Sequence, residues 1–332
     1  MKPSVSVVLP VFNAAATISR SIRSVLHQTL SDIELIVVND GSTDETPEIV
    51  RRCRDRRLKM VELPHLGVAA AANKGTRLAQ ADVIARMDAD DVAHPTKLEQ
   101  QLQLMRSADF DVVGCRVNII DGAGTAVPGL QRYERWINEE TLTPARIRAR
   151  RFVEFPLVNP TILARRSYFS HEFRSNGFPE DYDLMLRAAQ AGMSFGKVDQ
   201  VLFDWIDSAG RLTRRDARYS TQAFMQCRRH YLLTGPLHGI SRVDLWGAGQ
   251  TGKPWLRWLQ ARGITVRQIF EVNRRKIGQR IHDVPVVDVA AMGSADGVPL
   301  FIAVGAAGAR SMIEAHIAER DYVEGTDAWF VA

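Results

Sequence analysis

The sequence predicts an α/β fold: a mixed, mostly parallel sheet flanked by helices, followed by a smaller α/β domain. Apolar, strand-like runs alternate with helical periodicity through the first ninety residues, and this order is typical of parallel sheets covered by helices. A chain of 332 residues is too long for one ordinary core and indicates about two domains. A helical segment at 219–233 ends at the Thr234-Gly235-Pro236 break, so we expect domains at 1–235 and 236–332.

The elements of the first half follow from their residue patterns. The run Val5 to Val11 is continuously apolar, as expected of a strand buried on both faces, and later runs repeat this pattern. Between the runs, apolar residues recur at helical spacing. The expected elements are strand 5–11, a helix through Ile18, Ile22, Val25 and Leu26, strand 33–38, a helix starting near Pro47, strand 58–63, helix 67–79 and strand 82–87.

Acidic turns follow two of these strands. Asp40 comes directly after the second strand, and Asp88, Asp90 and Asp91 follow the fourth. Ligands of such sheets bind beyond the carboxyl ends of the strands, so both turns should line one crevice. If 87–91 is extended, Asp88 and Asp90 point to the same side, and two adjacent carboxylates favour Mg²⁺ or Mn²⁺. The alternative is a solvated acidic turn.

Composition describes a globular protein, with 45% hydrophobic and 24% charged residues and no apolar run of about 18 residues. No signal peptide is visible, and Cys53, Cys115 and Cys227 lack metal-ligand spacing, which favours a reduced, cytoplasmic protein. The net charge is +5, with basic clusters at 146–151 and 211–218. They suit either phosphates or peripheral contact with the inner face of a membrane, or else solvated helix faces. No basic motif indicates nucleic acid.

Five motifs follow one another through the first two-thirds of the chain. They are Pro10-Val11-Phe12-Asn13, Val38-Asn39-Asp40-Gly41-Ser42-Thr43-Asp44, Asn73-Lys74-Gly75, Met87-Asp88-Ala89-Asp90-Asp91 and Pro179-Glu180-Asp181-Tyr182-Asp183. In their order and spacing they resemble family 2 glycosyltransferases with the GT-A fold over residues 4–215. The resemblance implies an inverting, metal-dependent enzyme that moves a sugar from a nucleotide-diphosphate sugar, with UDP favoured. The implied acceptor is a glycan or lipid-linked hydroxyl in the synthesis of cell-surface polysaccharide.

By this resemblance Asp181 is the base for the acceptor hydroxyl, and Glu180 supports it or contacts the acceptor. Asp90 ligates the Mn²⁺ or Mg²⁺ ion, and Asp88 lies on the ribose or metal side. The chemistry agrees, because the leaving diphosphate needs charge stabilisation and the hydroxyl needs a proton acceptor. For the acids at 180–183 alone, the alternative is a favourable helix N-terminus. The implied donor-binding residues are Pro10, Phe12, Asn13, Asp40, Asn73, Asp88, Ala89 and Arg211.

The chain departs from the family pattern at two places. Ala72 stands where many relatives carry an arginine, so Lys74 or Arg77 is a candidate for the missing cation. The loop after the last GT-A strand lacks the histidine that relatives often have. Arg211 and Thr213 are the candidate phosphate contacts in that loop.

The second domain carries the pattern G-x-G-x-x-G, formed by Gly247, Gly249 and Gly252, between strand 243–246 and helix 254–262. A strand at 266–270 then ends at Glu271, and Leu300 to Val304 before Gly305 repeats the strand-then-glycine order. This resembles a small Rossmann-like domain, in which glycines let the backbone approach a pyrophosphate.

Three interpretations of the second domain stay open: binding of a nucleotide or nucleotide sugar, a scaffold for docking or homodimer formation, and NAD-dependent chemistry. Exposed Trp255 and Trp258 would favour docking, but both can equally pack against the sheet. No dehydrogenase acid/base pair is visible, which disfavours NAD. For the whole chain, a nucleotidyltransferase is disfavoured because 10–13 is no glycine-rich phosphate loop, and a non-catalytic nucleotide-binding scaffold is the remaining alternative.

Overall fold

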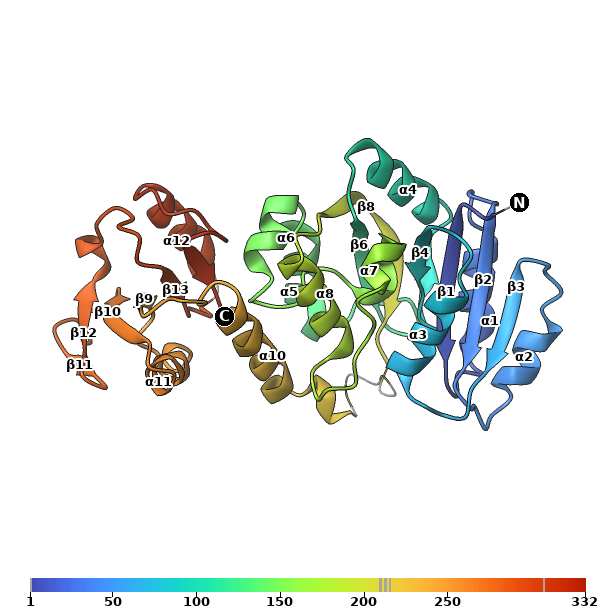
Figure 1. Ribbon diagram of the computed structural model, residues 1–332, viewed down its shortest axis with the longest axis horizontal. Helices are drawn as coiled ribbons and strands as arrows, with labels where there is room; N and C mark the ends of the chain where they lie inside the picture. The colour runs from blue at the N-terminus through green and yellow to red at the C-terminus, as the bar shows by residue number, and fades with distance from the viewer. Residues whose placement is uncertain (1, 209–210, 212–213, 215, 307) are drawn as a thin grey trace. The chain divides into compact units, whose positions relative to one another are not determined.

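A computed structural model describes residues 2–208, 211, 214, 216–306 and 308–332 (Figure 1). The chain forms two compact units. The first contains Met1–Ile147 and Pro156–Cys227, and the second contains Arg148–Phe155 and Arg228–Ala332. Helix α10 (Thr221–Thr234) therefore belongs to both units, and the Gly-Pro break ends it. Among the described residues no helix is long and apolar enough to cross a membrane.

The first unit is built on an eight-stranded sheet in the order β3-β2-β1-β4-β7-β6-β8-β5. The first four strands in this order are parallel, β7 is antiparallel to both neighbours, and β8 is parallel to β6 but antiparallel to β5. The predicted mixed, mostly parallel sheet is confirmed. The strands are β1 (Val5–Val11), β2 (Ile33–Asn39), β3 (Leu58–Glu62), β4 (Val83–Arg86), β5 (Val92–Ala93), β6 (Val112–Ile120), β7 (Leu163–Arg165) and β8 (Phe195–Ile206).

Every residue of β1 and β2 is buried, which explains their continuously apolar sequence. The glycine of the Asn-x-Gly motif, Gly75, lies where α3 crosses β1, and a Cβ there would overlap the side chain of Val8. The motif thus brings one helix close to the central strand. The helices of this unit are α1 (Ile18–Leu26), α2 (Thr46–Arg52), α3 (Val68–Leu78), α4 (Lys97–Ser107), α5 (Gln131–Arg135), α6 (Pro144–Arg150), α7 (Arg166–Phe169) and α8 (Glu180–Gln190), with the last residues of α6 in the second unit.

The second unit has a six-stranded sheet in the order β11-β12-β10-β9-β13-β14. All neighbouring strands are parallel except β11 and β12. The first strand of the unit, β9, lies inside the sheet, between β10 and β13, as in doubly wound folds. The elements are β9 (Arg242–Trp246), α11 (Gly252–Ala261), β10 (Thr265–Glu271), β11 (Arg280–Ile281), β12 (Val284–Asp288), β13 (Leu300–Ile302), α12 (Ala309–Ala318) and β14 (Ala328–Phe330).

Residues 148–155 pack into this second unit although they precede it by many residues. Arg150 is fully buried and forms ion pairs with Glu314 and Glu324. The ring of Phe152 lies edge-on against Trp329, with centroids 5.6 Å apart. The basic cluster 146–151 was expected to face phosphates, a membrane or solvent. For Arg150 these expectations are wrong, because its charge is neutralised inside the protein.

Candidate active site

The acidic turn after β4 differs from the extended geometry that the sequence suggested. β4 ends at Arg86, and the chain turns at Ala89 and Asp90, so the carboxylates do not alternate along a strand. The turn nevertheless gathers them, since one carboxylate oxygen each of Asp88, Asp90 and Asp91 lies within 4.8 Å of the others. The expected convergence of these acids thus arises from a turn.

Asp91 is the most enclosed of the three acids. Its Oδ1 accepts a hydrogen bond of 2.8 Å from the backbone N–H of Ile206, and its Oδ2 has no hydrogen-bond partner among the described residues. The guanidinium of Arg211 lies 3.8 Å from that oxygen and covers the ring of Trp205 at 4.4 Å. Arg211 is therefore placed at the acidic turn, while the candidate Thr213 lies outside the described residues.

The acids at this turn repel one another. Burial raises the pKa of Asp90, and the charge of Asp88 raises it further. Burial likewise raises the pKa of Asp91, with Asp90 and Asp88 adding to the effect. Three converging carboxylates with an unpartnered buried oxygen fit a hard divalent cation, which prefers oxygen ligands and would offset the repulsion.

A buried arginine lies under the same turn, and the sequence analysis missed it. Arg86 is 2% exposed, and it donates hydrogen bonds of 2.9 Å to Asp88 Oδ1 and to the carbonyl of Met87. A lone arginine at the end of an apolar strand, directly before acids, is a signal that could have identified it. Because an unpaired buried charge is costly, Arg86 and Asp88 hold each other in place.

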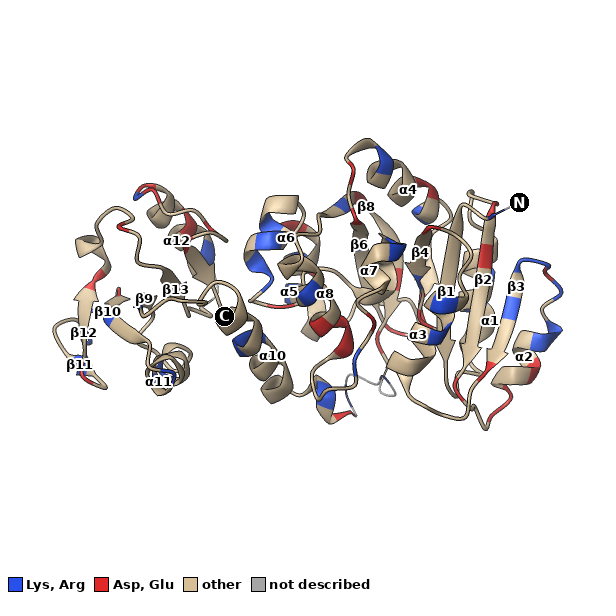
Figure 2. Cartoon of the chain, in the orientation of Figure 1, with Lys and Arg blue, Asp and Glu red and all other residues tan. Residues whose placement is uncertain are grey.

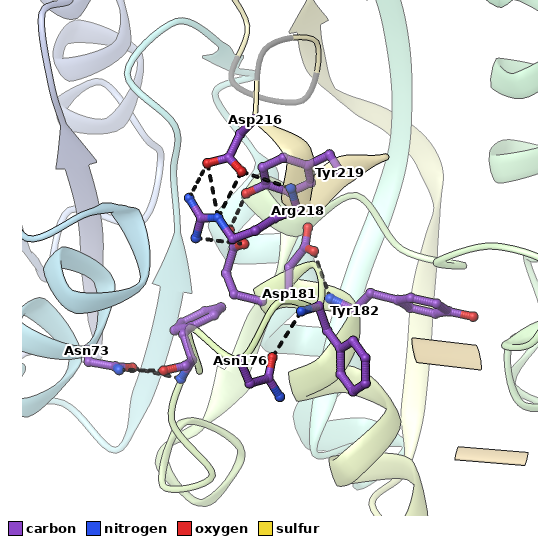
Figure 3. A network of polar contacts seen from close by, with 10 residues as sticks. Asn73, Asn176, Asp181, Tyr182, Asp216, Arg218 and Tyr219 are labelled. Carbon is purple, nitrogen blue, oxygen red and sulfur yellow. Dashed lines mark hydrogen bonds and ion pairs between the residues drawn. The ribbon is translucent and has the colours of Figure 1, made fainter. Parts of the chain in front are cut away.

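The second acidic group opens helix α8. Asp181 Oδ1 accepts a hydrogen bond of 2.7 Å from the backbone N–H of Tyr182 (Figure 3). Burial raises the pKa of Asp181 far above the usual carboxyl range, and the charges of Glu180 and Asp88 raise it further. The effect of Asp88 indicates that these two carboxylates, far apart in sequence, lie near each other in the fold.

Glu180 is held by a segment that the sequence analysis placed in a helix. The helix α10 begins at Thr221 instead, and Tyr219 lies on a 3₁₀ turn before it. The phenol of Tyr219 donates a hydrogen bond of 2.5 Å to Glu180 Oε1, and the guanidinium of Arg218 lies 3.8 Å from Oε2. Arg218 itself donates hydrogen bonds to both carboxylate oxygens of Asp216 (Figure 3). No local pattern marks these long-range contacts.

The expected nucleotide residues lie at the carboxyl ends of β1 and β2. Pro10 is buried in β1 opposite Val38, whereas Phe12 is 44% exposed. Its ring stacks on His65, with centroids 4.1 Å apart. This exposed aromatic pair offers a surface on which a planar base can stack.

Asn13 and Asp40 shape the loops beside that aromatic pair. Asn13 has a φ of 49°, and its Oδ1 accepts a hydrogen bond of 2.8 Å from the N–H of Thr43. The buried carboxylate of Asp40 accepts hydrogen bonds of 2.7 and 2.8 Å from the N–H groups of Leu66 and Gly67. Asp40 therefore fixes the loop that carries His65, and its recognition of a base stays a prediction.

The asparagine of the Asn-x-Gly motif makes its hydrogen bonds within the protein. The amide of Asn73 is buried and exchanges two hydrogen bonds of 2.8 Å with the backbone of Phe173 (Figure 3), so it anchors the segment that leads to α8. Arg77 forms an ion pair of 2.5 Å with Glu172. Lys74 has no ion pair in the described part of the chain and is the freer of the two candidate cations. The donor contacts of Asn73 and Ala89 stay predictions.

The glycine pattern of the second unit lies between β9 and α11, as the sequence predicts. Gly247 has a φ of 118°, which other residues rarely adopt, and a Cβ on Gly252 would overlap its carbonyl. The carboxylate of Glu271 accepts hydrogen bonds from the N–H of Ala248, at 3.2 Å, and from Lys276, at 3.2 Å. The loop geometry thus matches the expectation, and nucleotide binding by Gly247, Gly249 and Gly252 stays a prediction.

The two tryptophans of α11 pack inward. Trp255 is 0% exposed and Trp258 is 9% exposed, and their rings meet edge to face with centroids 5.4 Å apart. The guanidinium of Arg229 lies 5.3 Å from each ring. Docking through exposed tryptophans is therefore excluded for this helix, because both rings are buried inside the unit.

The family model of glycosyl transferase family 2 matches residues 6–173, which is more than half of the 332 residues. An uncharacterized glycosyltransferase of Nostoc sp. is 36% identical over 121 residues, covering 36% of this chain and 38% of that protein. The putative glycosyltransferase EpsE of Bacillus subtilis is 29% identical, covering 68% and 83%. The chain spans less than half the length of the Nostoc relative.

Solved structures show the same fold. S. aureus TarS 1–349, in complex with UDP-GlcNAc, has a TM-score of 0.56 at 20% identity, covering 71% of this chain and 67% of that one. The mannosyltransferase PcManGT from Pyrobaculum calidifontis, in complex with GDP-Man and Mn²⁺, has a TM-score of 0.55 at 21% identity, covering 71% and 66%. The implied GT-A fold is confirmed. With more than half of its length matched by the family model, this chain is a member of glycosyl transferase family 2.

Proposed function

We propose that the first unit transfers a sugar from a nucleotide-diphosphate sugar to an acceptor hydroxyl, with inversion at the anomeric carbon. The observation that carries the proposal is the convergence of the carboxylates of Asp88, Asp90 and Asp91 in one turn, with Asp181 in the first turn of α8 near enough for Asp88 to raise its pKa. One acidic group faces where the diphosphate would lie, and the other faces the acceptor. Membership of the family supports the same assignment.

Asp181 acts as the base in this proposal. Its carboxylate takes the proton of the acceptor hydroxyl as the acceptor oxygen bonds to the anomeric carbon, and the bond from that carbon to the diphosphate breaks. A raised pKa suits this role, since the carboxylate becomes a stronger proton acceptor. Glu180, held by Tyr219 and Arg218, positions the first turn of α8 and lies beside the acceptor.

Asp88, Asp90 and Asp91 are the residues that would hold a divalent cation, either Mn²⁺ or Mg²⁺. When bound, such an ion supplies charge stabilisation to the leaving diphosphate. The donor set of carboxylate oxygens fits this ion class, and the related mannosyltransferase was solved with Mn²⁺. Arg211, beside Asp91, adds a permanent positive charge at the same turn.

The donor is proposed to be a UDP-sugar, with its base stacked against Phe12 and His65 and read at Asp40. The exposed aromatic pair and the neighbouring acid support this placement. TarS binds UDP-GlcNAc and the mannosyltransferase binds GDP-Man, so the test includes both nucleotide classes. We extend the proposal to a glycan or lipid-linked acceptor in polysaccharide synthesis.

The test is release of nucleotide diphosphate from a panel of UDP-sugars and GDP-mannose, with Mn²⁺ or with chelator. Wild-type protein should use one donor class and require the metal, and Asp181→Asn should reduce acceptor-dependent release by about a thousandfold. Equal rates in the wild type and in Asp181→Asn would show that another group is the base. Metal-independent release would remove the cation from the proposal.

A further inference from the structure

A cavity of about 580 Å³ lies in the first unit, away from the acidic site. It is lined by α1, α2 and the loop at 53–57 that leads to β3. The loop adjoins the start of β2, because the N–H of Leu35 bonds the carbonyl of Arg57. Asp40 and Asp88 instead follow the carboxyl ends of their strands. The cavity and the proposed active site thus lie at opposite edges of the sheet.

Four of the eleven residues that line this cavity are arginines (Figure 2 shows the basic residues at the end of α2 and on the following loop). Arg57 is fully engaged, since it pairs with both carboxylate oxygens of Asp55 and donates to the carbonyl of Leu26. Asp55 is the single acid among the lining residues, and Arg57 neutralises it. No acid among the lining residues is therefore left to neutralise the other arginines of the wall.

Three more arginines are among the lining residues, namely Arg23, Arg52 and Arg54. Their side chains are exposed and have no ion pair or hydrogen bond among the residues that the structure describes. By contrast, Arg51, which does not line the cavity, pairs with Glu48 and Glu62. Stabilising the helix ends does not account for all three, because Arg57 already covers the last carbonyl of α1.

The rest of the lining combines apolar side chains with Ser19, His27 and Cys53. Ile22, Leu26 and Ile49 contribute to the wall, and the volume lies within the range of about 300–1,000 Å³ typical of ligand sites. A guanidinium group pairs with phosphate oxygens through two parallel hydrogen bonds, which favours phosphate over other anions. We propose that this cavity binds an organic phosphate, whose phosphoryl group contacts the three free arginines and whose organic part contacts the apolar wall.

Such a phosphate has two sources, a lipid headgroup and a soluble phosphate ester. The test compares the full-length wild type with the variant R23Q/R52Q/R54Q and with a control, R106Q/R262Q/R274Q. The control removes the same charge from exposed arginines that lie outside the cavity. Thermal unfolding by circular dichroism verifies that all three proteins are folded.

The probes are glycerol 3-phosphate, measured by calorimetry, and phosphatidylcholine vesicles with and without phosphatidic acid, measured by co-sedimentation. We expect binding of at least one phosphate probe, weakened about tenfold or more in the cavity variant and unchanged in the control. If the cavity variant loses binding only to vesicles that contain phosphatidic acid, the ligand is a lipid headgroup. If it loses binding only to glycerol 3-phosphate, the ligand is a soluble ester. Equal losses in both variants, or no binding by the wild type, would overturn the proposal.

Discussion

The phenol of Tyr219 donates a hydrogen bond of 2.5 Å to the carboxylate of Glu180 at the first turn of α8. Glu180 is 4% exposed, and its other oxygen has no hydrogen-bond partner among the described residues. Tyr219 is thus the main neutral donor to a buried acid that adjoins the proposed base. The segment around Tyr219 consequently controls how Glu180 and Asp181 are presented.

Removing this hydrogen bond should impair catalysis more than donor binding. We expect Tyr219→Phe to lower kcat by about tenfold, because a buried acceptor left without its donor costs about 1–3 kcal/mol. Calorimetric affinity for the nucleotide should stay within about threefold. Tyr322→Phe, at a buried tyrosine of the second unit, is the control and should leave kcat unchanged. A Tyr219→Phe variant with wild-type kcat would mean that this contact does not position the acids.

Replacing the proposed base separates transfer from binding. In Asp181→Asn the amide oxygen can still accept the N–H of Tyr182, so the geometry of α8 is retained. Transfer should fall by about a thousandfold, since the group that accepts the proton is gone. Binding of the donor nucleotide should change little. Loss of nucleotide binding in this variant would assign Asp181 to the donor site instead.

The pH dependence of transfer follows from the same group. Burial, Glu180 and Asp88 raise the folded-state pKa of Asp181, and a base must be unprotonated. We therefore expect kcat/KM to rise with pH along a limb displaced above the ordinary carboxyl pKa of about 3.9. Steady-state rates at fixed metal concentration measure the limb. A limb at the ordinary carboxyl value would contradict the enclosed, acid-flanked position of Asp181.

The ionised carboxylate of Asp181 should also destabilise the folded protein. A carboxyl whose folded-state pKa exceeds its unfolded value destabilises the protein increasingly as pH rises through the folded-state pKa. Asp181→Asn should therefore raise Tm by about 2–4 °C at alkaline pH and have little effect at acid pH. Thermal unfolding across pH tests this. Asp109→Asn, at an exposed position, is the control and should show no such trend.

The part of the fold that the sequence predicts well is the part with strong local patterns. β1 was expected at Val5 to Val11 and lies there, because a strand buried on both faces must be apolar throughout. Nothing local marked the packing of residues 148–155 into the second unit, which depends on partners such as Glu314 and Glu324. Long-range contacts of this kind leave no periodic pattern.

The candidate site also has residues that the local sequence identifies and residues that depend on long-range contacts. Asp88 and Asp90 could be identified because acids at the end of a parallel strand have a topological meaning. The extended geometry suggested for them was wrong, because the strand ends at Arg86 and a turn gathers the carboxylates. Tyr219 was predicted within a helix, but it lies on a turn. Its role could not be predicted locally, because it depends on a hydrogen bond to Glu180, which is distant in sequence.

We propose that the acidic turn holds a divalent cation together with a nucleotide diphosphate. Calorimetric titration of UDP, GDP and dTDP, with Mn²⁺ or chelator, into the wild type and Asp90→Ala tests this proposal. We predict that one nucleotide, with UDP favoured, binds only with metal, and that Asp90→Ala weakens this binding by about tenfold or more. Binding that is equally tight with chelator, or the absence of binding by any of the three nucleotides, would contradict the claim.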